Sequence, residues 1–494
     1  MRYAIACLLV AAVAAAAAAQ APQAPDTPAA RRLRAYVDAF NSGDEKAVAA
    51  FMTANMARSS LAARPLEERL ARYREIRGAL GGFDVRRVEA SGATSASALA
   101  RTHKGEMVAI VLDVEPEPPH GILGIRIEPS SEPDPGPAGS TAPVPAPVPD
   151  ADAARVAARA DAFLSKLVGM GFSGTALVAV GDRVVFEKAY GMADRAKGVP
   201  NTTATLFDVG SLGKQFTAAA ILKLEMMGKL DTADSIARHL DGVPADKRAI
   251  TIHHLLTHTS GLMQKNNVYR GETFRDRDRR VAELLAAPPR FEPGRQMEYN
   301  NGGYTLAAAI VERVSGQPYQ RFVHEQLLVP AGMASTGFHT GFAVPGLAER
   351  TVARLYDGER DNGLPGREEF AWYVAGAGGY LTTPADLFRW HVALSDERVL
   401  SAAAKRKLYT PFLGSYAYGW SVRTGSYGTV IGHGGGTSLG TGAYLARYID
   451  AGVTIAFAMN GSGERFIDIV RDGLTKAAFG REPEVPAKLP DREE

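Results

Sequence analysis

A serine and a lysine three residues apart are the most reactive pair that the sequence offers. Ser211 and Lys214 form the single Ser-x-x-Lys pattern of the chain and lie in a run with helical spacing, Phe207–Lys223. Residues at i and i+3 share a helix face, so the lysine amine can approach the serine hydroxyl. That hydroxyl becomes a nucleophile when a base takes its proton, and a lysine is such a base once burial lowers its pKa. The pair predicts covalent catalysis; a surface serine and lysine on a helix are the alternative.

A tyrosine and an asparagine two residues apart can support that pair. Tyr299 and Asn301 follow the turn-forming residues Pro293 and Gly294. A phenol works as an acid or base when a nearby cation favours its ionised form, and Lys214 can supply that charge. The asparagine amide can steady the lysine. Tyr-x-Asn alone indicates nothing, so this role depends on the other motifs.

A glycine-rich segment, His433–Gly436, ends a predicted strand that begins at Gly428. Glycines let a substrate lie close against a strand edge. The backbone N–H of Gly436 can then join that of Ser211 as an oxyanion hole, close to the unpaired N–H groups of the predicted helix start. A glycine-rich turn after an edge strand is the alternative. A phosphate-binding loop is not indicated, because no Gly-Lys-Ser/Thr ending is present.

Taken in this order, the three motifs resemble those of the serine β-lactamase and penicillin-binding superfamily. The branch in question contains class C β-lactamases, family VIII carboxylesterases, D-aminopeptidases and D-alanyl-D-alanine carboxypeptidases. Three further segments look like parts of that branch: Thr251–Leu262, Tyr299–Phe338 and Ala377–Leu387. The resemblance covers about residues 155–475, nearly the whole large domain.

The resemblance implies acyl transfer in two steps, through an acyl-enzyme that water or another acceptor then releases. The site residues that it implies are the acylated nucleophile Ser211, its base or base partner Lys214, the second acid/base group Tyr299, the supporting amide of Asn301, and His433 with Gly435 as the third motif. Gly436 joins them as the predicted oxyanion donor.

One position departs from the β-lactamase pattern. Their third motif usually opens with a lysine, whose charge meets the carboxylate of the drug, whereas this chain has His433. A histidine with a near-normal pKa is mostly neutral at pH 7. The resemblance therefore favours an ester or amide hydrolase over an efficient β-lactamase. A Ser-Asp-Asn motif after Ser211 is missing as well, which argues against a class A enzyme.

A main role in the small N-terminal domain, with the large domain as a scaffold, is one alternative, and the intact Ser/Lys/Tyr/Asn set argues against it. Three functions of the large domain remain open. The favoured one is a secreted serine hydrolase that acts through a Ser211 acyl-enzyme on small esters or peptide-like amides. A β-lactamase, or a D-alanyl-D-alanine carboxypeptidase or D-aminopeptidase, is the second. A protein that is slowly acylated by penicillins or wall peptides and scarcely turns over is the third. The expected partners are small molecules of these classes: esters, β-lactams or D-peptides. The oligomeric state is left open.

The first 20 residues predict export. Arg2 precedes an apolar, alanine-rich run that ends in small residues near Gln20, which is the layout of a secretory signal peptide. We expect a periplasmic or secreted protein without a membrane span once this segment is removed; an uncleaved anchor is the alternative. The single cysteine, Cys7, lies inside the run. The mature chain then has no disulfide and no thiolate site for a metal.

Hydrophobic periodicity predicts an α+β fold in two domains. A small α+β domain, residues 29–129, has helices first and a strand meander after, and its opening resembles the cone-shaped domains of the nuclear-transport-factor-2-like (NTF2-like) superfamily. A Pro/Ala-rich linker, residues 130–150, separates it from the large domain, residues 151–480, and a polar tail covers 481–494. Strands at both ends of the large domain predict one antiparallel sheet with helices and a helical lobe between them, and a site in a cleft between sheet and lobe.

Composition excludes several other classes. The chain has 494 residues, 46% of them hydrophobic and 22% charged, with a net charge of +2. That balance gives no reason to expect nucleic acid as a partner. His254 and His258 have the spacing of half a zinc site, but the glutamate of the His-Glu-x-x-His pattern is missing. The sequence therefore predicts no metal and no cofactor.

Overall fold

The computed structural model describes residues 26–91, 93–129, 153–263, 276–338, 343–366 and 371–489. The predicted signal peptide and linker lie outside the described residues, as do the last five residues of the predicted tail. Within those ranges no helix is both long enough and apolar enough to cross a membrane.

The N-terminal region is built from helices followed by strands, as the sequence predicts. The helices are α1 (Pro28–Asn41), α2 (Glu45–Asn55), α3 (Arg58–Ala63) and α4 (Leu66–Leu80). The strands form one antiparallel sheet in chain order: β1 (Phe83–Ser91), β2 (Ser95–Thr102), β3 (Met107–Val114) and β4 (Ile122–Pro129). Thr27 caps α1, and its apolar stripe, including Leu33 and Phe40, is buried in the core of this region.

The large domain contains a six-stranded antiparallel sheet in the order β13-β14-β15-β16-β5-β6. Its strands are β5 (Gly174–Val180), β6 (Arg183–Tyr190), β13 (Ser421–Gly425), β14 (Gly428–Gly436), β15 (Gly442–Tyr448) and β16 (Val453–Met459). Strands from the two ends of the domain therefore share one sheet, which confirms the predicted architecture. Short strands lie between them: β7 (Met192–Asp194), β8 (Val199–Pro200), β9 (Phe207–Asp208), β10 (Leu355–Asp357), β11 (Arg360–Gly363) and β12 (Leu381–Thr382).

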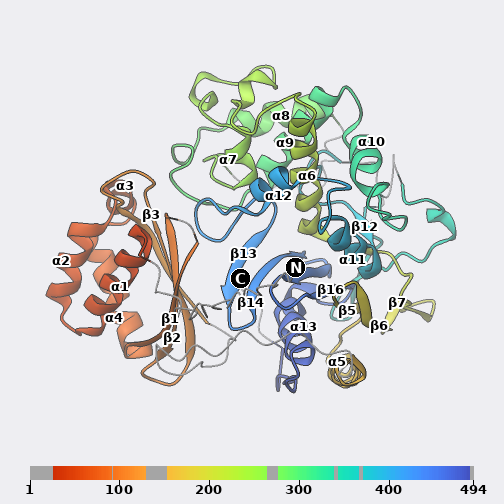
Figure 1. Ribbon diagram of the computed structural model, residues 1–494, viewed down its shortest axis with the longest axis horizontal. Helices are drawn as coiled ribbons and strands as arrows, with labels where there is room; N and C mark the ends of the chain where they lie inside the picture. The colour runs from red at the N-terminus through yellow and green to blue at the C-terminus, as the bar shows by residue number, and fades with distance from the viewer. Residues whose placement is uncertain are drawn as a thin grey trace, which may run out of the picture.

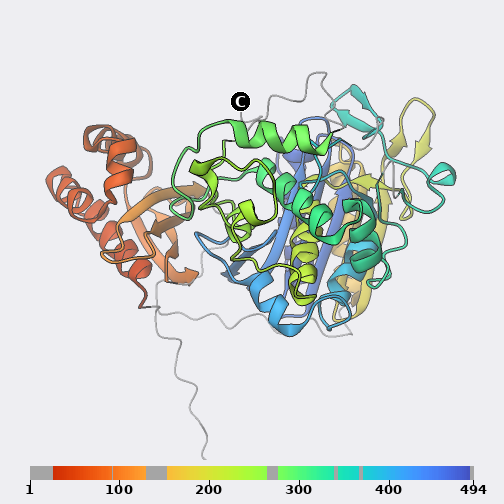
Figure 2. The ribbon, with the colours of Figure 1, turned by 90° about the horizontal axis from the view of Figure 1, so that it is seen from above.

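Helices cover both faces of this sheet (Figures 1 and 2). On one face lie α5 (Ala153–Val168) and α13 (Gly463–Ala478), which share a core with the strands. On the other lie α6 (Gly213–Met226) and the helical lobe around it, with its own larger core. The remaining helices are α7 (Ile252–Leu256), α8 (Arg277–Ala286), α9 (Asn301–Ser315), α10 (Tyr319–Val323), α11 (Pro384–Ala393) and α12 (Ala402–Tyr409).

The glycine-rich segment differs from the turn that the sequence allowed. Strand β14 continues through Gly436 instead of ending at His433, and it lies between β13 and β15 instead of at an edge. Glycines carry no side-chain pattern that marks a strand, but their backbones pair fully with β15 in this register, from Gly434 opposite Tyr444 to Gly436 opposite Gly442.

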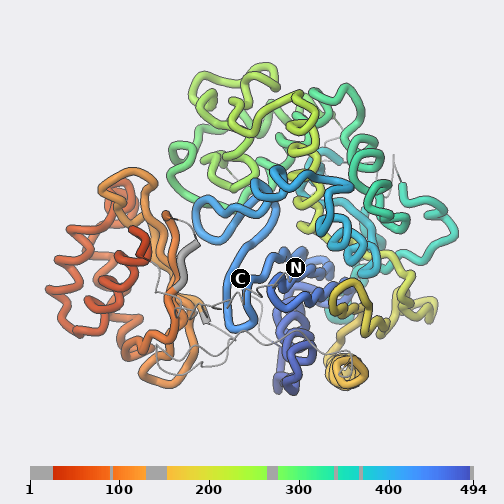
Figure 3. The backbone as a smooth tube through the Cα atoms, viewed as in Figure 1, coloured from red at the N-terminus to blue at the C-terminus, as the bar shows by residue number. Residues whose placement is uncertain are grey.

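The two domains touch through the sheet of the N-terminal region (Figure 3). The hydroxyl of Thr94, between β1 and β2, donates a hydrogen bond to the carbonyl of Phe412 at 3.1 Å. Phe412 belongs to the loop between α12 and β13 of the large domain. In the same loop, a Cβ at Gly414 would lie 3.7 Å from Oδ1 of Asp113 on β3. The loop therefore connects the small sheet to the hydrolase-like domain.

Candidate active site

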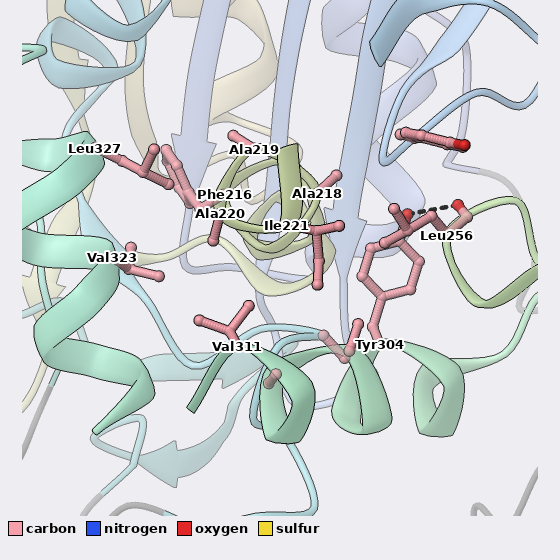
Figure 4. Packing of buried hydrophobic residues seen from close by; sticks show 14 of the residues in the cluster. Phe216, Ala218, Ala219, Ala220, Ile221, Leu256, Tyr304, Val311, Val323 and Leu327 are labelled. Carbon is pink, nitrogen blue, oxygen red and sulfur yellow. Dashed lines mark hydrogen bonds between the residues drawn. The ribbon is translucent and has the colours of Figure 1, made fainter. Parts of the chain in front are cut away.

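Helix α6 is the central element of the helical lobe. Its residues from Gly213 to Leu222 are buried without interruption, and small alanines at 218–220 let neighbouring helices approach closely. Figure 4 shows Phe216 and Ile221 of α6 among side chains of the surrounding lobe. Tyr304 of α9 donates its hydroxyl to the carbonyl of Leu256 at 2.7 Å, which ties α9 to α7 beside it. Groups at the start of α6 are therefore held in a rigid setting.

Ser211 and Lys214 meet at the start of this helix. Lys214 Nζ lies 2.9 Å from Ser211 Oγ and donates to the carbonyl of Ala377 at 3.1 Å. The lysine is fully buried, and burial lowers the pKa of its amine well below the usual value. Its hydrogen-bond partners among the described residues include no carboxylate that would hold a proton on it. The predicted pair is thus in contact, with a lysine that readily becomes neutral.

The turn that carries Ser211 is fixed from both sides. Gly210 has φ of 49°, a left-handed conformation that favours glycine, and its N–H donates to Asp208 Oδ1 at 2.7 Å. Burial raises the pKa of Asp208 to about 6. A short 3₁₀ turn, Gly210–Leu212, then leads directly into α6 and leaves Ser211 half-buried at the helix start.

Tyr299 lies next to the pair, as the sequence predicts. Lys214 Nζ is 4.7 Å from the centre of the Tyr299 ring and 5.7 Å from that of Tyr304. The burial that lowers the pKa of Lys214 also weakens the positive charge that was expected beside the phenol. Asn301 is the first residue of α9, two positions after Tyr299. Its support of the lysine stays a prediction.

His258 holds the segment that carries Tyr299. Its Nδ1 accepts the backbone N–H of Asn300 at 3.0 Å, and its ring lies 4.3 Å from the Tyr299 ring, centre to centre. Burial lowers the pKa of His258 well below the usual value, and the positive charges of Lys214 and His433 lower it further by smaller amounts. The ring is therefore neutral with its proton on Nε2. The backbone of His258 has a φ of 59°, which is rare for a residue with a side chain. Backbone strain of this kind is often found at functional sites.

His433 faces the same group of rings from β14. The hydroxyl of Tyr416 lies 2.8 Å from His433 Nε2, and His433 Nδ1 lies 2.5 Å from the carbonyl of Gly434. A carbonyl only accepts, so Nδ1 carries the proton and Nε2 accepts from Tyr416. Burial, followed by the nearby Lys214, lowers the pKa of His433 to about 3. From the sequence we assumed a near-normal pKa for His433. In the structure this pKa is low, and the ring is neutral at pH 7.

The glycines of β14 lie directly against the Ser211 turn. A Cβ at Gly435 would be 2.0 Å from the carbonyl oxygen of Val209 and 2.8 Å from the nitrogen of Ser211, so only glycine fits. A Cβ at Gly210 would lie 3.3 Å from the nitrogen of Gly436. The backbones of Ser211 and Gly436 are thus near neighbours, as an oxyanion hole requires.

Sequence reasoning missed two members of this group. Tyr416 had no pattern of its own, because its role depends on a contact between the loop before β13 and His433 of β14. His258 was considered only as a zinc ligand, although its segment resembled the β-lactamase-related branch. Among the described residues no group of histidines and carboxylates could hold a metal ion.

Comparison with known proteins decides the family. The model of the family described as Beta-lactamase matches residues 160–478, more than half of the chain. The chain belongs to the beta-lactamase family of serine hydrolases. The match leaves out the N-terminal region, so the NTF2-like resemblance stays a prediction.

Relatives within the family are distant and differ in their names. Penicillin-binding protein 4* of Bacillus subtilis (strain 168) is 30% identical over 350 residues, covering 65% of this chain and 75% of that protein. Esterase EstB of Burkholderia gladioli is 33% identical over 221 residues, covering 39% of this chain and 55% of that protein. The solved D-amino acid amidase of Ochrobactrum anthropi SV3 shares the fold, with a TM-score of 0.56 at 24% identity, over 65% of this chain and 98% of that one.

Proposed function

We propose that this protein hydrolyses small esters, and more slowly peptide-like amides, through an acyl-enzyme on Ser211. The observation that carries the proposal is the contact of 2.9 Å between Ser211 Oγ and the amine of the fully buried Lys214. An amine held in this setting gives up its proton easily, and it lies within reach of the hydroxyl that it must activate.

The first half-reaction uses groups already in place. Neutral Lys214 takes the proton of Ser211, whose oxygen attacks the substrate carbonyl carbon. The oxyanion forms beside the N–H groups of Ser211 and Gly436, and Tyr299 passes a proton to the leaving alcohol or amine. In the second half-reaction the phenolate of Tyr299 takes a proton from a water molecule, whose oxygen attacks the acyl carbon. Lys214 returns its proton to the oxygen of Ser211 as the acid leaves, which restores all three groups.

Substrate preference follows from the third motif. His433 is neutral, and both of its ring nitrogens are engaged, with Tyr416 and with the carbonyl of Gly434. It offers a substrate carboxylate neither a charge nor a free N–H. An uncharged ester needs neither, whereas penicillins and D-alanyl peptides carry a carboxylate. The names of the esterase and amidase relatives support this choice.

Hydrolysis of p-nitrophenyl butyrate by the wild type and by Ser211→Ala tests the proposal. We expect multiple turnover by the wild type and loss of it in the variant. Ser395→Ala, at an exposed serine two residues after the end of α11, is the matched control and should keep full activity. Turnover that survives in Ser211→Ala would remove Ser211 as the nucleophile.

Intact mass after incubation with benzylpenicillin separates the alternatives. The names of penicillin-binding relatives keep a binding role open as the second candidate. A stable adduct on Ser211 without ester turnover would establish that role. Rapid turnover of the penicillin would instead indicate a β-lactamase.

We also propose that the protein is exported through residues 1–20. The support is the basic and then apolar layout of that segment. Fractionation of a bacterium that expresses the full chain, with N-terminal sequencing of the exported form, tests it. Retention of the intact N-terminus in the cytoplasm would contradict export.

A further inference from the structure

The N-terminal region contains a cavity of its own, away from the Ser211 site. It measures about 550 Å³ and lies where α4 faces β4, closed from behind by residues of α1 and α2. Cavities of this size commonly hold small organic molecules. None of the groups assigned to hydrolysis lines it.

Apolar side chains form about half of the cavity lining. Met52 and Met56 are buried at its inner side, while Ile76 of α4 and Ile125 and Ile127 of β4 are half-buried. Half-buried aliphatic side chains on two facing elements leave apolar surface that neither element covers. Methionines adapt their shape to an apolar guest at little energetic cost.

Two phenols add a polar requirement to this lining. Tyr73 is 6% exposed, and its buried hydroxyl has no hydrogen-bond partner among the residues that the structure describes. Tyr36 lines the cavity beside it, and burial together with Tyr73 raises the pKa of Tyr36, so its hydroxyl keeps its proton. A buried hydroxyl without a partner is unfavourable, so the phenol of Tyr73 leaves an unsatisfied polar group just behind the cavity wall.

The charged side chains at the cavity give it a positive character. Four arginines line it against two glutamates: Arg64, Arg69, Arg72 and Arg126 against Glu75 and Glu128. Arg64 makes no ion pair with any described residue. Burial, followed by the charge of Arg64, lowers the pKa of Arg69, so two guanidinium groups repel each other at this site. An anion between them would relieve that repulsion.

From the cavity, its apolar side chains and the arginines at its edge, we infer that the N-terminal region binds a small amphipathic organic acid. The apolar body of the ligand lies between α4 and β4, and its carboxylate meets the guanidinium groups of Arg64 and Arg69. The region is then a ligand-binding module attached to the hydrolase.

Calorimetric titration of the full chain with dodecanoate, and with dodecan-1-ol as the uncharged probe, tests the inference. We expect one dodecanoate bound per chain, and binding of the alcohol weaker by about tenfold or more, since it lacks the charge. Equal affinity for the two probes would overturn the assignment of an acid. Absence of binding by both would overturn the site.

Two tryptophan variants locate the binding. Ala79 is an exposed lining residue of α4, so Ala79→Trp fills the cavity without disturbing the core. Ala71→Trp places the same side chain on the same helix outside the lining and is the control. We expect Ala79→Trp to weaken the binding of dodecanoate at least about tenfold, and Ala71→Trp to leave the affinity unchanged. Equal effects, or none, would place the ligand elsewhere.

A pair of arginine variants tests the charge separately. Arg64→Gln should weaken dodecanoate several-fold and leave dodecan-1-ol unaffected, whereas Arg58→Gln, at an exposed arginine of α3 outside the lining, should change neither. Circular dichroism confirms that each variant is folded.

Retained hydrolysis of p-nitrophenyl butyrate by Ala79→Trp separates this cavity from the Ser211 site. Unchanged dodecanoate affinity in Arg64→Gln would remove Arg64 from the inference.

Discussion

At the scale of single residues, the buried lysine decides what Ser211 can do. Replacing Lys214 by Met keeps the length of the side chain and removes the base. We expect kcat/KM for p-nitrophenyl butyrate to fall by about 10²–10⁴-fold, the usual contribution of a positioned base. Lys223→Met, on the same helix with its amine bonded to the carbonyl of Val399, is the control and should stay within a few-fold of the wild type. An equal loss in both variants would point to damage to α6 and not to a missing base.

The same lysine makes stability depend on pH. Burial lowers its pKa, so between the folded-state and unfolded-state pKa values the unfolded chain binds more protons than the folded chain. Stability therefore rises with pH across that window, by about 1.4 kcal/mol per unit of pKa difference. Lys214→Met should melt at a higher temperature than the wild type at pH 7, and the gap should shrink as the pH approaches about 10.4. Thermal melts at pH 7 and 9.5 measure the difference in melting temperature between the variant and the wild type. A difference that stays constant would contradict the shifted pKa of Lys214.

The proposed preference for uncharged substrates depends on His433. His433→Lys introduces a cation where the neutral ring now accepts from Tyr416. We expect acylation by benzylpenicillin to gain at least about tenfold relative to p-nitrophenyl butyrate, because the carboxylate then meets a charge. His433→Gln, which changes the side chain without adding charge, controls for the lost contact with Tyr416. The same ratio in both variants would show that charge at this position does not set the preference.

At the scale of elements, the end of β14 must pass very close to the Ser211 turn. Gly435→Ala places a Cβ 2.0 Å from the carbonyl oxygen of Val209, so strand and turn have to separate. We expect kcat to fall by about 100-fold or more, as for the loss of one oxyanion donor, with a smaller change in KM. In Gly434→Ala the new Cβ points to the opposite face, where the nearest atom is a ring carbon of Tyr444 at 3.2 Å. The loss of kcat in this variant should be far smaller. Comparable losses in the two variants would contradict this geometry.

Elements with a clear pattern could be predicted from the sequence, and those that depend on distant contacts could not. Strands β5, β15 and β16 can be recognised in the sequence, because each is an apolar run between turn residues. The last residues of β14 are glycines without such a pattern, so the extension of the strand appeared only with its partner β15. The contact of Ser211 with Lys214 followed from helical spacing. Tyr416 entered the site through a contact between a loop and a strand that no local rule describes.

At the scale of the whole molecule, the N-terminal sheet lies behind one wall of the candidate site. Thr94 bonds the carbonyl of Phe412, whose ring packs edge-on against His253 with the ring centres 4.6 Å apart. Four residues after Phe412, Tyr416 donates to His433 and lies 6.1 Å, ring centre to ring centre, from Tyr299. One loop thus spans the distance from the small domain to the hydrolytic groups.

That connection predicts that damage at the domain contact reaches the site. Thr94→Lys removes the bond to Phe412 and places a long charged side chain against the loop, which loosens Tyr416 and with it the neutral setting of His433. Coupling between separated sites typically amounts to about 0.5–2 kcal/mol, so we expect kcat/KM for p-nitrophenyl butyrate to fall about 2- to 30-fold. Thr53→Lys, at an exposed threonine of α2, adds the same charge to the helical side of the domain and should have no effect. Equal activity in the two variants would show that the small domain is mechanically independent of hydrolysis, and that any influence of its cavity on the site must take another route.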